Sequence, residues 1–210
     1  RVLLLSQTGI VEHIIREISK VIYELQNSID VSEAKVIKRF FSEVSGLRMR
    51  ERYCLDIVKT IYEKQSYPSN QGGLEKAFME FCDTDPNVNA FIKINEHYHD
   101  FARINFVRAD GMLAPYSPDF IVRTRDDVFI VETKGEDRLS TDNVKLKRLA
   151  MLDWIERVNQ LNPDDRMGLA WGYALLGENT FYGMSEKGAS VPEILNYAKL
   201  TKQVIEGTLF

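Results

Sequence analysis

The sequence predicts an α/β domain with a small mixed central sheet flanked by helices, preceded by an all-helical connector. Three helical stripes of apolar residues occupy the first third of the chain, whereas the remainder alternates strand-like and helical patterns. A stretch rich in turn-forming residues separates them, running from Gln65 to Gly73. We therefore expect a helical connector over residues 1–66 and a sheet-containing domain over residues 67–210.

Each expected helix of the connector follows from apolar spacing. The first carries apolar residues three and four apart from Val11 to Leu25. Asp30 and Glu33 form a possible capping pair for a second helix that runs to Val44. Residues 54–62 repeat the apolar spacing and predict a third helix.

The larger domain mixes both periodicities. A short amphipathic helix is expected over 74–82, ended by Asp85-Pro86. Strands are expected over 90–94, 102–107, 119–124, 128–133 and 169–176, and a long helix over 143–161. Ser190 and Glu193 predict the capping box of a C-terminal helix.

Composition narrows the class of protein. The chain has 210 residues, of which 44% are hydrophobic and 28% charged, so a disordered or coiled-coil chain is excluded. The net charge of −4 argues against a simple basic DNA-binding module. Two cysteines cannot build a disulfide framework and fit a reducing, cytoplasmic location. No apolar run is long enough for a transmembrane helix. Because the chain begins with Arg1, we expect it to be part of a longer protein.

Two carboxylates and a lysine interrupt two otherwise apolar strands. Asp119 opens one strand, and Glu132 and Lys134 end the next. If Asp126 and Asp127 form a two-residue turn, Asp119 pairs with Lys134. Cross-strand partners and residues two apart share a face, so all three side chains are expected on one face. Charged groups there are costly unless they pair or bind metal.

Such a cluster suits hydrolysis of a phosphodiester bond. Carboxylate oxygens are ligands that Mg²⁺ prefers. The metal activates a water and offsets charge that develops on the phosphate, and a lysine beside it can orient or deprotonate that water. An alternative metal pair, His97 and His99, lacks a third ligand at suitable spacing.

These residues resemble the signature of the PD-(D/E)xK nuclease superfamily. More narrowly, the series is similar to the C-terminal endonuclease domain of the restriction subunit of type III restriction enzymes. The likeness extends from about residue 72 to residue 176. It rests on Pro118-Asp119-Phe120, on Glu132-Thr133-Lys134-Gly135, and on a helix with four spaced positions, which are Val144, Lys147, Ala150 and Trp154.

The resemblance implies a restriction-endonuclease-like fold and a set of site residues. Asp119 and Glu132 would bind the metal together with the main-chain carbonyl of Thr133, and Lys134 would be the catalytic lysine. The family often adds a glutamate from the preceding helix; Glu75 and Glu80 are candidates. Because Glu75 lies nearer the apolar stripe, it is preferred. Lys147 is expected either to contact DNA or the active site or to lie on the surface.

The implied activity is Mg²⁺-dependent cleavage of double-stranded DNA, with Mn²⁺ as a possible substitute. A methyltransferase subunit would choose the site, and ATP would bind only to an upstream translocase, because the chain lacks a phosphate-binding GxxxxGK[ST] loop. Alternatives are a repair or junction-resolving nuclease of the same superfamily, and a catalytically silent interaction module.

Overall fold

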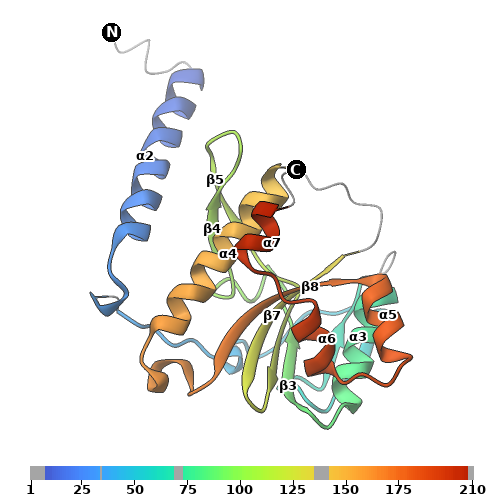
Figure 1. The fold of residues 1–210 in the computed structure, drawn as a ribbon. Coiled ribbons are helices and arrows are strands. Elements are labelled where there is room, and N and C mark those ends of the chain that lie inside the picture. Colours follow the sequence, from blue (N-terminus) through green and yellow to red (C-terminus); the bar gives the residue numbers. More distant parts are fainter. Residues whose placement is uncertain (1–7, 34, 69–72, 135–141, 208–210) are drawn as a thin grey trace.

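The computed structural model describes residues 8–33, 35–68, 73–134 and 142–207. It has a mixed α/β architecture with six α-helices in these ranges (Figure 1). The helices are α2 (Thr8–Ser28), α3 (Gly73–Thr84), α4 (Asp142–Gln160), α5 (Glu178–Ser185), α6 (Val191–Tyr197) and α7 (Lys202–Gly207). The strands are β1 (Cys54–Asp56), β2 (Lys64–Ser66), β3 (Val88–Lys93), β4 (Ile104–Val107), β5 (Leu113–Tyr116), β6 (Phe120–Thr124), β7 (Asp127–Lys134) and β8 (Ala170–Gly177). Short 3₁₀ helices span Val31–Glu33, Phe41–Glu43, Glu51–Tyr53 and Pro163–Arg166.

The central sheet has four strands in the order β3-β6-β7-β8. β3, β6 and β7 are antiparallel neighbours, whereas β8 runs parallel to β7. The connection from β7 to β8 passes through α4, as a parallel pair requires. Hairpins β1–β2 and β4–β5 form two further small sheets. The predicted mixed central sheet flanked by helices is therefore confirmed.

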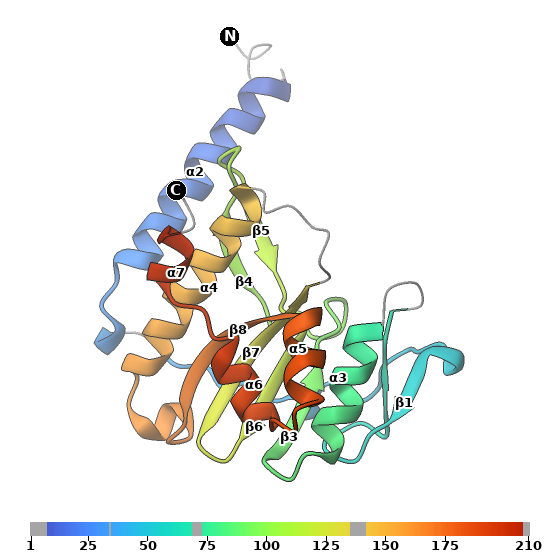
Figure 2. The same ribbon diagram turned by 45° about the vertical axis from the view of Figure 1, so that its right-hand side comes forward.

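Helices cover both faces of the sheet (Figure 2). On one face, Phe129 and Val131 of β7 pack with residues of α3, α5 and α6. On the other face, Ile130 packs with α4, α7 and the β4–β5 hairpin. Side chains alternate along a strand, so Glu132 projects toward the α4 face with Ile130. The capping box of α6 is present as predicted, with the Glu193 carboxylate accepting bonds from the main chain and hydroxyl of Ser190.

Only the first part of the expected connector is an α-helix. α2 confirms the first apolar stripe, and its apolar side chains are largely exposed, with Ile18 at 54%. It lies beside the β4–β5 hairpin, where Arg16 donates a hydrogen bond to the carbonyl of Asp110 (Figure 1). The expected helix to Val44 is wrong: short 3₁₀ turns flank residues without regular structure. Asp30 instead accepts bonds from the Ser32 main chain and hydroxyl.

The expected helix over residues 54–62 is also wrong, because this segment begins a β-hairpin. Strands β1 and β2 pair from Cys54 with Ser66 to Asp56 with Lys64. Ile57 is buried in the core beside α3, whereas Val58 is 87% exposed, so the apolar residues do not share one face. Asp83 of α3 accepts the main-chain N–H groups of Val58 and Lys59, which ties the hairpin to the sheet domain. Short apolar runs do not distinguish strand from helix by themselves.

Part of the turn-rich stretch, residues 69–72, lies outside the described residues, as does Gly135. No helix of the described ranges is long and apolar enough to cross a membrane.

Candidate active site

The candidate site lies at the ends of β6 and β7, on the side of the sheet that α4 covers. Phe120 pairs with Val131 and Arg123 with Val128. One position further out, the N–H of Asp119 donates to the carbonyl of Val131, the residue before Glu132, at 3.1 Å.

This register differs by two residues from the predicted one. The expected partner of Asp119 was Lys134, from a turn made of Asp126 and Asp127 alone. The observed turn is wider, because the Thr124 side chain bonds with the N–H and carbonyl of Asp127 at 3.1 and 3.2 Å. A shift of two leaves Glu132 and Lys134 on one face of β7, and the Asp119 side chain contacts Thr133, which lies between them.

Asp119 is held by the neighbouring strand. Its Oδ2 accepts the main-chain N–H of Thr133 at 2.7 Å and the Thr133 hydroxyl at 2.8 Å. The carbonyl of Asp119 accepts the N–H of Ile94 at 2.8 Å, so both edges of this residue are bonded. These contacts fix where the carboxylate lies.

Glu132 is surrounded by three donors from three different elements. Its Oε2 accepts the hydroxyl of Tyr116 at the end of β5, and the hydroxyl of Tyr173 on β8 at 3.3 Å. Its Oε1 accepts the ammonium of Lys147 on α4 at 2.6 Å. The same ammonium lies 4.5 Å from the centre of the Tyr116 ring. Glu132 is therefore a fixed carboxylate in a partly buried polar network.

Burial keeps the two tyrosines protonated. It raises the pKa of Tyr116 far above its ordinary value, and the neighbouring Tyr173 and the charge of Glu132 raise that pKa further. Burial also raises the pKa of Tyr173, followed by the charge of Glu132. Both hydroxyls consequently remain available to donate to the carboxylate, and their oxygens lie 3.2 Å apart.

Lys134 is the last residue of β7 and lies opposite Gly177 of β8. It follows Glu132 by two positions on the same face of the strand. Thr133, between them, contributes its N–H and hydroxyl to Asp119. The four residues of the two strand ends are thus adjacent in space.

Glu75 belongs to a neighbouring polar contact on the other face. It is 17% exposed and forms an ion pair with Lys93 at the end of β3. Lys93 also lies 4.9 Å from the centre of the Phe120 ring, whose side chain packs in the core beside α3. Glu80, the other candidate, pairs with Lys76 in solvent. Glu75 is thus the less exposed of the two candidate glutamates, as its position near the apolar stripe predicts.

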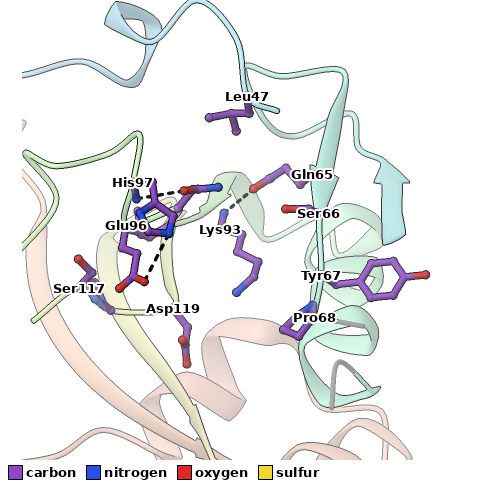
Figure 3. A pocket seen from close by; sticks show the side chains of 13 residues that line it. Leu47, Gln65, Ser66, Tyr67, Pro68, Lys93, Glu96, His97, Ser117 and Asp119 are labelled. Atoms are coloured by element: carbon purple, nitrogen blue, oxygen red, sulfur yellow. Dashed lines mark hydrogen bonds and ion pairs between the residues drawn. The ribbon is translucent and has the colours of Figure 1, made fainter. Parts of the chain in front are cut away.

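A cavity of about 370 Å³ lies beside Asp119. Figure 3 shows Lys93 and Asp119 lining it, together with Gln65 from β2. Gln65 is 1% exposed, and its side-chain oxygen Oε1 accepts the main-chain N–H of Lys93. The cavity extends the site from the strand ends toward the β1–β2 hairpin.

The donor set can be compared with what Mg²⁺ requires. Among the described residues, no group of three or more histidine, cysteine, aspartate or glutamate side chains could hold a metal ion. The expected set is smaller: the carboxylates of Asp119 and Glu132 and the main-chain carbonyl of Thr133. Oxygen ligands with several waters suit Mg²⁺, so the chemistry fits. Lys147, however, already pairs with Glu132 and must move for a cation to bind there.

Two tyrosines of the network were missed by the sequence reasoning. Tyr116 directly precedes Ser117-Pro118-Asp119, and Tyr173 lies within the strand expected over residues 169–176. A tyrosine in an apolar segment is expected to be buried, and a buried tyrosine usually has a hydrogen-bond partner for its hydroxyl. That expectation is the only feature of the sequence that points to these two residues. Nothing in the sequence shows that both hydroxyls meet one carboxylate.

Comparisons of the chain with protein-family models, with curated proteins and with solved structures find no match.

Proposed function

We propose that this chain is a Mg²⁺-dependent endonuclease domain that hydrolyses phosphodiester bonds of double-stranded DNA. The observation that carries the proposal is the contact between the two strand ends, where the Asp119 carboxylate accepts the N–H and hydroxyl of Thr133, the residue between Glu132 and Lys134. Two carboxylates beside a lysine at the ends of neighbouring strands are the groups that metal-assisted hydrolysis uses. Both carboxylates are held by hydrogen bonds, which favours a site prepared for a ligand.

Each residue has a definite task in this proposal. Asp119 and Glu132 hold the metal, and Thr133 positions Asp119 while offering its carbonyl. The bound metal would supply an activated water and offset the charge that develops on the phosphate. Lys134 would orient the attacking water and stabilise, through its positive charge, the negative charge that develops on the phosphate. Glu75 is the further carboxylate that the resemblance implies, and it pairs with Lys93, which lines the cavity beside Asp119.

The narrower assignment is the nuclease part of a type III restriction subunit. It is supported by the resemblance of the complete residue series, including Lys147 and Ala150 on the helix after β7. In this proposal a methyltransferase subunit selects the site, an upstream part binds ATP, and the protein acts in the cytoplasm. The repair nuclease and the silent module remain alternatives that experiment separates.

Metal binding is the direct test, because it does not require assembly with other subunits. Isothermal titration calorimetry with Mn²⁺ should detect one site that Glu132→Ala removes. Asp126→Asn, at the opposite end of the β6–β7 hairpin, is the matched control and should leave binding unchanged. Lack of binding by the wild-type chain at millimolar Mn²⁺ would refute the proposal.

Plasmid cleavage with Mg²⁺ tests the chemistry. We expect Glu132→Ala and Lys134→Ala to abolish cleavage, but Lys134→Ala to retain Mn²⁺ binding, because the lysine acts on water and phosphate. A repair nuclease would cut without a methyltransferase partner, whereas a type III fragment would depend on it. Normal cleavage by Lys134→Ala would contradict the assigned role.

A further inference from the structure

The ammonium of Lys147 on α4 binds one carboxylate oxygen of Glu132, Oε1. The two side chains form an ion pair with an N–O distance of 2.6 Å, and they are 22% and 14% exposed, respectively. The other oxygen of Glu132 accepts the hydroxyls of Tyr116 and Tyr173. Both carboxylate oxygens therefore already have donors.

The three donors are not equally easy to displace. Tyr116 is 7% exposed and Tyr173 fully buried, so neither hydroxyl can exchange its bond to Glu132 for a bond to bulk water. Lys147 is partly exposed, and its four-carbon stem lets the ammonium reach water by rotation. A cation that approaches Glu132 would therefore displace the ammonium and leave the tyrosines in place.

We propose that Lys147 is a built-in competitor of the divalent cation at Glu132, and that cation binding transfers its ammonium to a DNA phosphate. This inference rests on the proposed nuclease function. An ammonium and a divalent ion repel strongly in a partly buried site, so they exclude each other from the same carboxylate oxygen. Once displaced, the ammonium remains beside the site where the cut strand must lie.

The exchange links metal binding to DNA binding. Without the cation, Lys147 is engaged with Glu132 and unavailable to phosphate. With the cation, one more positive side chain faces the DNA, so each ligand strengthens the binding of the other by the same factor. The ion pair thereby also compensates the partly buried charge of Glu132 before the cation arrives.

Calorimetry with Mn²⁺ on the full chain tests the competition. Lys147→Met keeps an apolar chain over the Tyr116 ring but removes the charge. We expect it to bind Mn²⁺ at least about tenfold more tightly than the wild type, the scale of effect found when groups around a metal site are changed. Lys147→Arg retains the charge and should bind as weakly as the wild type.

Lys145→Met is the control for general loss of positive charge. Lys145 lies two residues earlier on α4, about 200° around the helix from Lys147. We expect its Mn²⁺ affinity to stay within about twofold of the wild-type value, because charges separated through solvent are screened. Lys147→Gln provides a second neutral variant in case Lys147→Met folds poorly, which circular dichroism would show.

A second readout uses fluorescence anisotropy of a labelled DNA duplex with and without Ca²⁺. Ca²⁺ should tighten DNA binding of the wild type by about fivefold or more, but that of Lys147→Met by less than about twofold. A fivefold effect lies within the usual range of coupling between two ligands that bind one protein.

The outcomes separate the two proposals. If the wild type and Lys147→Met bind Mn²⁺ equally, the competition is refuted while the metal site stands. If neither binds Mn²⁺, both the competition and the nuclease function are refuted. Tighter binding by Lys147→Arg would also overturn the inference, because the charge would then not be the competing group.

Discussion

Removal of the Tyr116 hydroxyl is expected to destabilise the folded protein through its effect on Glu132. Tyr116→Phe keeps the ring, which is 7% exposed and packs in the core on the α4 face, so no cavity forms. The lost group is the donor to Glu132 Oε2. A hydrogen bond to an ionised partner contributes about 1.5–3 kcal/mol, and Tyr173 at 3.3 Å compensates only in part.

We therefore expect Tyr116→Phe to lower the free energy of unfolding by about 1.5–3 kcal/mol at pH 7. Urea denaturation followed by tryptophan fluorescence measures this. Trp154 and Trp171 pack edge to face with ring centres 5.7 Å apart, so their emission should report loss of the α4–β8 contact. Tyr197→Phe is the control: Tyr197 is 73% exposed, and its loss of a hydroxyl should cost less than about 0.5 kcal/mol.

A double-mutant cycle with Glu132→Gln assigns the effect to the contact. In that background the acceptor is neutral, and Tyr116→Phe should cost only about 0.5–1.5 kcal/mol. Equal costs in both backgrounds would show that the hydroxyl does not act through the charge of Glu132. A cost below about 0.5 kcal/mol in the wild type would refute the network itself.

Three further predictions concern other parts of the molecule. Burial lowers the pKa of His99, so near neutral pH the folded protein binds fewer protons than the unfolded chain. The stability that this shift contributes is present above the pKa of the unfolded chain and is lost as the pH falls through the pKa of the folded protein. His99→Gln should therefore flatten the decline in urea midpoint between about pH 7 and pH 5. An unchanged slope would contradict this. Gly172→Val should destabilise by about 1–3 kcal/mol in the same assay, because even a Cβ would come within 3.1 Å of Lys199 and 3.3 Å of Phe129; wild-type stability would show that the strand has room. Ile18→Glu on α2 should change stability by less than about 0.5 kcal/mol, because Ile18 is 54% exposed, and a loss above about 2 kcal/mol would show that this stripe is covered.

The sequence predicted the elements whose patterns are long or locally closed. α2 and α4 extend over several turns, and the capping box at Ser190 is formed by residues three apart. Each of these signals is contained in neighbouring residues, so no distant contact was needed to find them. The segment 54–62 failed because five apolar residues fit a helix as well as a hairpin, and its hairpin is anchored by Asp83, which lies more than twenty residues away.

For the candidate site, the sequence determined that Glu132 and Lys134 share a face of one strand, because side chains alternate with a period of two. The predicted register of β6 and β7 was off by two, and the structure brings the Asp119 carboxylate to Thr133. Only the tertiary structure decided what surrounds them. Tyr116, Tyr173 and Lys147 reach Glu132 from β5, β8 and α4, and their meeting depends on how helix and hairpin pack on the sheet. Spacing along a chain contains no information on that packing, because it is set by contacts between segments far apart in sequence.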